Sequence, residues 1–502
     1  MSDLCFKKNL PAVLGMFSAL LLHNTTFGAP KAKSSEKTSE NSSQKKQKSS
    51  SEDNYSIKGG QFYEESAGKI ADDDVAGIRV VKDKIILLGY DRKSSSEAMK
   101  ADEAFSNLNF FKKYSKLVSA EFTEIELTKD RLENIQKFLQ KEIKNIVIDS
   151  CKIEPDNIAL LADVITKRNE IKNVTFRLID NESDGYDAII SAIEGLSELK
   201  TICLAFDKIK NDSCQKISEL IKKSAASLKN LSLAWNGVVE TDKEAEAYQK
   251  LSEAIGELNG LKAFELFLMS IDEKNTATLF AGVRNLTALS RFKLFLGNIS
   301  VQNEVKLFEN AESLGETLKE MTQLVTLDIS GMKLPTDVMQ VLAQNLKFLT
   351  KLECFNLSDN TIDAQCAEIL AASMKEMSKL QTLAINGCEL SAPLFATLCK
   401  AFDHSPMTML YARNNAIKEG VRSLPIKTMA DLKLADFSKN EVSFENAMEL
   451  IKLTVDHPKL QAINFRENAP LDSMEEADKK IKRDELENWK RENKCHVAFF
   501  GL

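Results

Sequence analysis

The sequence predicts an α/β solenoid, with a parallel sheet on the concave side of an arc and helices on the convex side. An eleven-residue phrase, LECFNLSDNTI from Leu352, recurs along the chain about every 28 residues. Within the phrase, apolar and polar residues alternate with the period of a strand. In the residues that follow, the apolar positions have helical spacing, as in Ala367, Leu370 and Met374. One strand–turn–helix unit cannot bury its own apolar face, so the units must stack.

About 13 copies of the phrase can be counted, and places 1, 4, 6 and 11 of each copy are typically apolar. Examples are LKNLSLAWNGV from Leu228 and LQTLAINGCEL from Leu380. The first places of the copies are Leu117, Ile143, Ile171, Leu199, Leu228, Leu261, Leu289, Leu324, Leu352, Leu380, Met407, Leu432 and Leu460. Two steps are longer than the others, one after the fifth copy and one after the seventh, so extra residues bracket that part of the arc.

Place 9 is predicted to be structural. It holds Asn in several copies, such as Asn360 and Asn440, and Cys in two others, Cys151 and Cys388. A buried Asn there can bond the turn backbone of its own and the next coil, which satisfies polar groups that would otherwise have no partner. Cys is small enough to occupy the same place.

The step of about 28 residues, the phrase and the Ala-rich helix of residues 364–377 resemble the ribonuclease-inhibitor type of leucine-rich repeat. That type also includes the recognition arms of NOD-like receptors and the Ran GTPase-activating proteins. The resemblance covers residues 117–470 and implies a horseshoe-shaped leucine-rich-repeat solenoid. Because members bind very different partners, it is specific for the fold and not for the function.

The remaining sequence divides into a signal, a linker and two caps. Lys7 and Lys8 precede an apolar run from Leu10 to Leu22, which predicts a signal peptide over residues 1–29 with cleavage after Gly28 or Ala29. The run is too short to span a bilayer comfortably, so no stable membrane span is expected after the signal is removed. Export is the predicted localisation.

A Ser- and Lys-rich segment, residues 30–57, is predicted to be a disordered linker because it has almost nothing to bury. Residues 58–116 are predicted to form an N-terminal cap with a hairpin, Ile78–Val81 and Lys84–Leu88, and a helix over 96–108. Residues 471–502 are predicted to form a C-terminal cap, with a charged helix over 472–493 and HVAFFGL as a last strand. Caps cover the open ends of a solenoid core.

Charge argues against nucleic acid as the main ligand. The net charge is −7, and removing +4 in residues 31–50 and +1 in residues 1–30 leaves about −12 for the rest. Phosphate binding needs a basic face, so the expected partner is a protein. The basic linker is interpreted as a solvated tether, since no aromatic residue is interleaved before Tyr55.

No catalytic, cofactor or metal site is predicted, so the protein is not expected to be an enzyme. The eight cysteines after Cys5 lack the regular spacing of a disulfide framework. His404 and His457 are interpreted as turn residues, and adjacent Cys495 and His496 would point to opposite faces of a strand. The acidic cluster at residues 72–74 lacks the ligand spacing of a calcium loop.

The partner-binding site is predicted from the free columns of the repeat. Places 3, 5 and 7 point into the concave face, and place 8 lies on the rim. In copies four to seven these columns become apolar and aromatic with charged neighbours, and the predicted site consists of Phe206, Trp235, Glu265, Phe267, Leu268, Arg291, Lys293, Phe295 and Leu296. Such a belt is typical of an interaction hot spot. The alternative is that its apolar residues pack on one another or on the longer loops.

The predicted function is a non-enzymatic, exported module that recognises a protein partner on its concave face, in the manner of a bacterial host-interaction protein. One alternative is a regulator that activates a small GTPase, because the Ran activators share the repeat type; this chain has no arginine that can be matched to a catalytic role. A second alternative is a structural or adhesive repeat protein of the cell surface.

Overall fold

A computed structural model of the chain describes residues 54–58, 61–65, 77–81, 84–88, 118–123, 125–139, 142–178, 186–206, 209–235, 244–268, 271, 273–296, 311–468 and 473–501. The predicted signal peptide, the acidic cluster at 72–74 and the predicted helix over 96–108 lie outside these residues. Residues 52–502 form one compact unit, which is the part described below.

Each of the 13 predicted copies contributes one strand within the described residues, and every strand begins at place 3. The strands are β5 (Ser119–Thr123), β7 (Asn145–Ile153), β8 (Asn173–Leu178), β9 (Thr201–Ala205), β10 (Asn230–Trp235), β11 (Ala263–Leu268), β12 (Arg291–Leu296), β13 (Thr326–Asp328), β14 (Cys354–Asn356), β15 (Thr382–Ala384), β16 (Met409–Tyr411), β17 (Leu434–Asp436) and β18 (Ala462–Asn464). Neighbouring strands pair in parallel and in register, so equivalent places form rows across the sheet.

A helix follows most strands. The helices are α3 (Lys129–Phe138), α4 (Pro155–Thr166), α5 (Tyr186–Glu194), α6 (Asn211–Ser224), α7 (Glu244–Gly256), α8 (Glu273–Val283), α9 (Ala311–Glu320), α10 (Thr336–Leu346), α11 (Ala364–Glu376), α12 (Ala392–Cys399), the 3-10 helix η3 (Lys418–Ser423) and α13 (Phe444–Lys452). The eleventh copy is the shortest, and it is the one in which a 3-10 turn replaces the α-helix.

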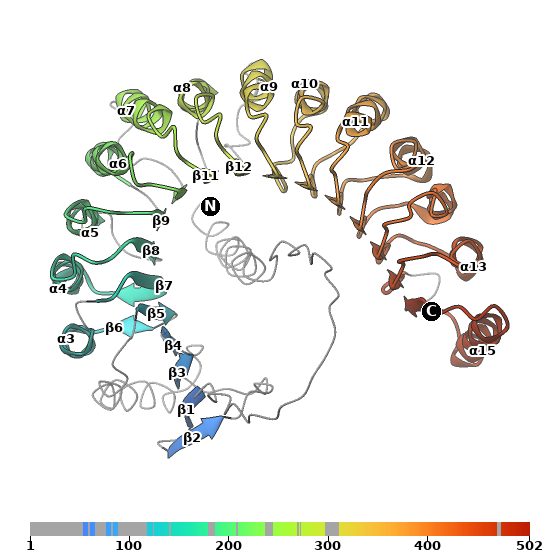
Figure 1. The fold of residues 1–502 in the computed structure, drawn as a ribbon, viewed down its shortest axis with the longest axis horizontal. Coiled ribbons are helices and arrows are strands. Elements are labelled where there is room, and N and C mark those ends of the chain that lie inside the picture. The colour runs from blue at the N-terminus through green and yellow to red at the C-terminus, as the bar shows by residue number, and fades with distance from the viewer. Residues whose placement is uncertain are drawn as a thin grey trace, which may run out of the picture. The chain divides into compact units, whose positions relative to one another are not determined.

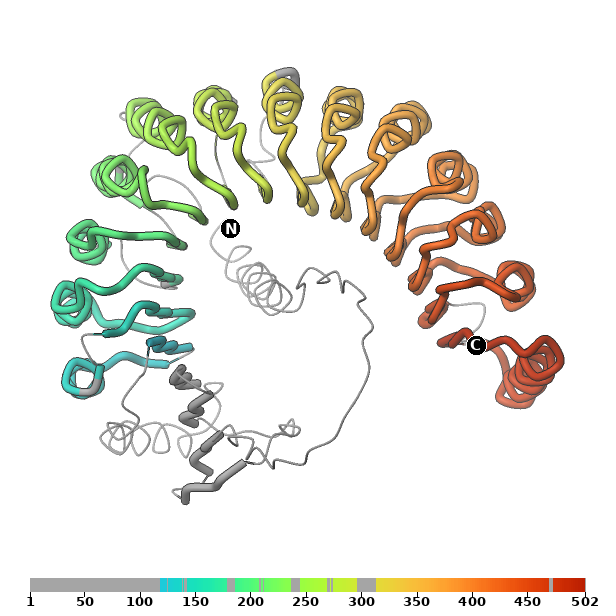
Figure 2. The backbone as a smooth tube through the Cα atoms, in the orientation of Figure 1, coloured from blue at the N-terminus to red at the C-terminus, as the bar shows by residue number. Residues whose placement is uncertain are grey.

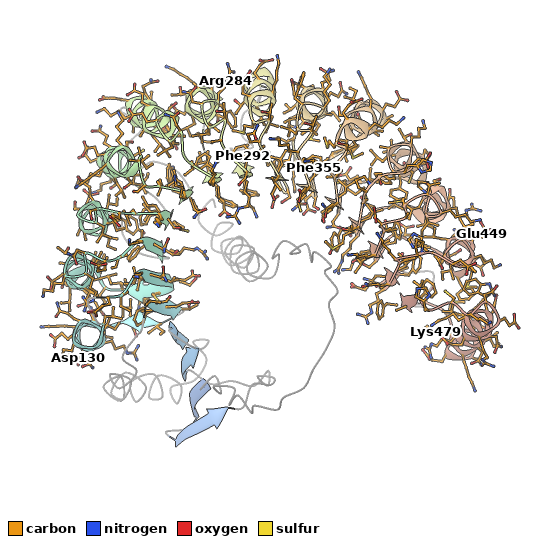
Figure 3. All side chains as sticks on the ribbon, in the orientation of Figure 1. Asp130, Arg284, Phe292, Phe355, Glu449 and Lys479 are labelled. Carbon is orange, nitrogen blue, oxygen red and sulfur yellow. The ribbon has the colours of Figure 1, made fainter. Side chains whose placement is uncertain are left out.

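From α3 onward, the described strands lie along the inside of an open arc and the helices along its outside (Figures 1 and 2). The core is the layer between them, where the residues at places 1, 4 and 6 are sealed from solvent, as Leu352, Phe355 and Leu357 show. In Figure 3, Phe355 lies on the sheet side of the arc, whereas Glu449 lies on the outer, helical side. The predicted leucine-rich-repeat solenoid is therefore confirmed as the fold class.

The repeats fall into two conformational classes. Up to the seventh copy the strands run to place 7 or beyond, as in β10, whereas from the eighth copy they stop at place 5, as in β14. In four of the six later copies an acidic or amide side chain at place 5 accepts a hydrogen bond from the N–H at place 7, whereas the tenth and eleventh copies have Ala384 and Tyr411 there. Asn356 accepts from Ser358 at 3.2 Å, and Asp436 accepts from Ser438 at 2.9 Å. In those four copies this Asx turn ends the strand.

Place 8 of the later copies then takes the left-handed conformation. Asp359 has a φ of 57° and Lys439 a φ of 56°, and Gly331 and Gly387 occupy the same place with φ values of 75° and 61°. Because the chain turns there, the side chains of Asp359 and Lys439 leave the core and are exposed. The prediction that place 8 lies on the rim is thus correct for these copies.

The structural role predicted for place 9 is confirmed by its contacts. Nδ2 of Asn360 donates to the Ile329 carbonyl at 2.9 Å and to the Leu357 carbonyl at 3.0 Å, while its Oδ1 accepts from the Leu334 N–H at 3.2 Å. The bonds therefore join its own coil to the preceding one, not to the next one as expected. The thiol of Cys388 contacts equivalent carbonyls, including that of Leu357 at 3.5 Å.

Both ends of the array carry atypical elements. At the N-terminal end, β1 (Asn54–Lys58), which starts inside the predicted linker, pairs antiparallel with β2 (Gln61–Glu65), and β3 (Gly77–Val81) and β4 (Lys84–Leu88) form the predicted hairpin. β4 then pairs in parallel with β5 and so continues the sheet. A short strand, β6 (Glu126–Leu127), pairs with β7.

At the C-terminal end, α15 (Glu476–Glu492) is followed by β19 (Ala498–Phe500), which pairs in parallel with β18. The expected charged helix and last strand are both present.

The cysteines from Cys151 onward are free thiols. Burial raises the pKa of Cys214, Cys366 and Cys388 to about 12. At pH 8 a thiol with that pKa is ionised in only about one molecule in 10⁴, and the thiolate is the reactive form. These thiols are therefore chemically quiet in the folded protein.

We expect a maleimide or disulfide reagent at pH 8 to modify only the half-buried Cys354 and Cys495 in the folded chain prepared without residues 1–29. The other six described cysteines should react only after unfolding in denaturant. Mass spectrometry of the labelled peptides measures this directly. Fast native labelling of Cys214 or Cys388 would contradict the burial of these places.

Candidate recognition surface on the concave face

Three residues of the predicted site are buried in the core, so their predicted exposure is wrong. Phe206 is 5%, Trp235 2% and Leu268 1% exposed. The Trp235 indole N–H donates to the hydroxyl of buried Tyr248 at 3.2 Å, and Phe206 stacks on Tyr186 with 4.3 Å between ring centroids. These side chains hold the sheet against the helices and do not face a partner.

The reason is the length of the strand. All three residues stand at place 8, where the earlier repeats have no Asx turn and the strand-like path continues. Side chains in a strand alternate between faces, so place 8 points the same way as the buried places 4 and 6. The signal is visible in the sequence, because Leu231, Leu233 and Trp235 alternate with period two. Leu296 also stands at place 8, and its side chain lies outside the described part of the structure.

Phe267 and Phe295 remain as an aromatic pair on the concave face. Both stand at place 7, are half-buried, and face each other across β11 and β12 in register. Their ring centroids are 6.3 Å apart with an interplanar angle of 29°. Phe295 also lies against Gly331, where a Cβ atom would come within 3.1 Å of its ring. Glycine at that turn lets the Phe295 ring lie close to the backbone.

Charged side chains border the aromatic pair. Glu265, Lys293 and Asp328 are register neighbours at place 5 of three successive strands. Lys293 Nζ lies 3.1 Å from the Asp328 carboxylate and 5.4 Å from the centre of the Phe267 ring. The Lys293 and Asp328 side chains are only 14% and 11% exposed, so this pair is better shielded than an ordinary surface ion pair. Arg291, at place 3, is exposed.

This arrangement combines partly exposed aromatic rings with charged side chains, as protein-binding surfaces usually do. Two stacked rings offer apolar area that stays partly open to solvent, and the Lys293–Asp328 pair holds one edge in a fixed position. Exposed Arg291 offers a guanidinium for a carboxylate on a partner. Of the predicted site, the structure therefore groups Glu265, Phe267, Arg291, Lys293 and Phe295 on one face.

Other parts of the concave face are polar. Arg177 Nη1 donates a hydrogen bond to the Asp149 carboxylate at 3.0 Å, and the arginine side chain is only 2% exposed. The two residues therefore form a buried, structural ion pair. Towards the C-terminal end, Arg413 and Lys439 both pair with Glu467, at 3.0 and 2.9 Å. The described concave face thus carries ion pairs on both sides of the aromatic pair.

The histidines at turns have the structural roles expected from sequence. His457 is buried; its Nε2 lies 3.1 Å from the Met429 carbonyl, and its Nδ1 accepts from the Leu460 N–H at 2.9 Å. His404 is exposed, with a φ of 56° in the turn after a helix. Among the described residues, no group of three or more His, Cys, Asp or Glu is placed to hold a metal ion. No described helix has the length and apolar composition to cross a membrane.

The repeated strand and turn, the buried places 1, 4 and 6 and the Asn bonds at place 9 define a leucine-rich-repeat solenoid. No protein-family model and no curated protein matches the sequence. Among solved structures, an internalin from Listeria monocytogenes aligns at 15% identity over 69% of this chain and 92% of that chain, with a TM-score of 0.37. TLR13, solved in complex with ssRNA13, aligns at 12% identity over 76% of this chain and 62% of that chain, with a TM-score of 0.35. At these scores the fold assignment rests on the repeat geometry of this chain.

Proposed function

We propose that this protein is a recognition module that binds a protein partner on the concave face of its leucine-rich repeats. The observation that carries the proposal is the aromatic pair Phe267–Phe295, half-open to solvent on a sheet face that is otherwise largely polar. Aromatic side chains beside fixed charges are the usual centre of a protein interface. The expected partner presents an apolar side chain to the rings and a carboxylate to Arg291.

We expect the double substitution Phe267→Ala and Phe295→Ala to weaken partner binding by about 30-fold or more, since hot-spot truncations cost about 2 kcal/mol or more. The partner is first identified by affinity capture, and its binding to each variant is then measured by calorimetry. The matched control is Tyr411→Ala, another half-buried aromatic residue of the concave face, five strands from Phe267 along the array. Equal binding by the double variant and the wild type would refute the proposal.

We further propose that the protein is exported and that its repeats are of the ribonuclease-inhibitor type. The signal pattern of residues 1–29 supports export, and the α-helix that follows most strands, with the step of about 28 residues, supports the repeat type. Cell fractionation tests export and separates a released protein from one held at the cell surface.

A further inference from the structure

A row of five lysines runs along one rim of the solenoid, and neither the fold nor the proposed concave site accounts for it. They occupy place 2, just before the strand, in five consecutive copies. This lysine ladder consists of Lys144, Lys172, Lys200, Lys229 and Lys262. Place 2 lies beside the edge of the concave face, because the strands begin at place 3.

Backbone hydrogen bonds fix the spacing of the lysine ladder. The N–H of Lys172 donates to the carbonyl of Lys144 at 2.8 Å, and the N–H of Lys200 donates to the carbonyl of Lys172 at 2.7 Å. Lys229 bonds Lys200 at 2.9 Å, and Lys262 bonds Lys229 at 2.8 Å. Each lysine is thus one strand spacing, about 4.8 Å, from the next, and the row is about 19 Å long.

Most of these ammonium groups are available to a ligand. Lys144, Lys200, Lys229 and Lys262 are exposed, and within the described residues none of them forms an ion pair with a carboxylate, although Lys200 helps to lower the pKa of Glu198 from a longer distance. Lys172 is half-buried and pairs with Glu198 at 2.7 Å. The Nζ atoms of Lys229 and Lys262 lie 3.4 Å from the Gly260 and Ala288 carbonyls, contacts that leave their charge uncompensated.

The repeat itself does not require lysine at place 2. The four copies from the eighth to the eleventh have Val325, Glu353, Gln381 and Thr408 there, with the same backbone pairing. Like charges facing one another on neighbouring strands destabilise a sheet. Glu170 and Glu198 offset part of this repulsion at Lys172 and Lys200, whereas Lys229 and Lys262 form no ion pair within the described residues, so an anionic ligand would offset the repulsion there.

We propose that the lysine ladder binds an acidic α-helix of a protein partner, in which Asp or Glu recurs once per turn. Carboxylates one turn apart on a helix are about 5.4 Å apart along its axis, close to the strand spacing of about 4.8 Å. A row of about 19 Å matches about 13 helical residues at 1.5 Å each. This surface is separate from the aromatic pair and does not depend on it.

The geometry favours a helix over the other anionic ligands. In an extended peptide, carboxylates on one face are about 6.7 Å apart, which falls out of step with the lysines within three strands. A lipid surface is met best by a plane of charges, whereas this is a single row. Single-stranded nucleic acid is bound through aromatic stacking, and place 3 of these copies holds Asn145, Asn173, Thr201, Asn230 and Ala263.

The test uses the full-length chain and two synthetic helical peptides in a fluorescence anisotropy titration. One peptide carries five Glu residues at alternating steps of three and four residues, so that they stay on one face of the helix about 5.3 Å apart, on an alanine background and stapled to remain helical. The other has the same composition with its Glu residues spread around the helix. We expect the first to bind more tightly, with an affinity that falls as salt rises from about 50 to 200 mM.

The decisive variant is Lys200→Glu, Lys229→Glu and Lys262→Glu together, expected to weaken peptide binding about tenfold or more because attraction becomes repulsion. The control reverses three exposed lysines elsewhere, Lys351→Glu, Lys379→Glu and Lys433→Glu, for the same change in net charge. Circular dichroism checks folding, and a Lys→Gln version of the ladder variant removes charge without repulsion.

Equal loss of binding in ladder and control variants, or equal binding of the two peptides, would show general electrostatic attraction and refute the proposal. Absence of peptide binding would also refute it. So would tighter binding of oligothymidine or of phosphatidylserine vesicles, run in parallel at the same salt. The Phe267→Ala and Phe295→Ala variant should bind the peptide normally, which separates a failure here from a failure of the concave site.

Discussion

Replacing Trp235 with Ala is expected to lower the free energy of unfolding by about 3–5 kcal/mol, the usual cost of removing a large buried ring. Trp235 is 2% exposed, and its indole N–H donates to Tyr248 at 3.2 Å. The substitution leaves a cavity between β10 and α7 and takes this donor from the Tyr248 hydroxyl. Denaturant unfolding followed by circular dichroism measures the change.

The matched comparison is Phe267→Ala, which removes an aromatic ring from the adjacent strand on the opposite face of the sheet. Because that ring is half-buried and adjoins solvent, the loss should stay below about 2 kcal/mol. Hydrogen exchange should rise around β10 in the first variant and not in the second. If Trp235→Ala unfolded at the wild-type denaturant concentration, the inward direction of place 8 would be wrong.

Replacing Asn360 with Ala is expected to cost at least about 2 kcal/mol, because buried backbone groups left without partners are expensive. Asn360 is 1% exposed and bonds the Ile329 and Leu357 carbonyls and the Leu334 N–H. Alanine has no group to replace any of these bonds. Since they join two coils, the loss should also weaken the contact between the eighth and ninth copies.

Asn356→Ala in the same copy provides the control. Asn356 is half-buried on the concave face and accepts one bond, from the Ser358 N–H at 3.2 Å. Its removal should cost less than about 1 kcal/mol. Exchange of the Leu334 amide proton should accelerate in the Asn360 variant alone. Equal destabilisation by the two substitutions would mean that place 9 has no special role.

The repeat pattern determined most of the fold because the same alternation of buried and exposed places occurs in 13 copies. The apolar places, the position of each strand and the role of the place-9 Asn follow from alternation and from the need to pair buried polar groups. The strands at the two ends of the array were also predictable, since HVAFFGL and the residues of β3 and β4 read as strands. The exposure predicted for place 8 in the earlier copies was wrong because the same backbone conformation was expected in every copy.

The candidate site was only half predictable for the same reason. Phe267 and Phe295 stand at place 7, and their exposure on the concave face follows from strand alternation alone. Trp235 stands one residue later, and its direction depends on whether the strand ends at place 5. Asp or Asn at place 5 signals that end in four of the six later copies, but the tenth and eleventh have Ala384 and Tyr411 there and their strands end at the same place. Ser232 in this copy therefore does not settle the direction of Trp235 from sequence.

By itself, the sequence determined that this protein is a solenoid, where each repeat lies and which column faces the core. Those properties depend on periodicity, which is local. Only the tertiary structure decided which free residues form a surface, because that depends on the rows that parallel pairing makes from separate copies. Pairing placed Phe295 beside Phe267, Lys293 beside Asp328, and five lysines in one line along the rim.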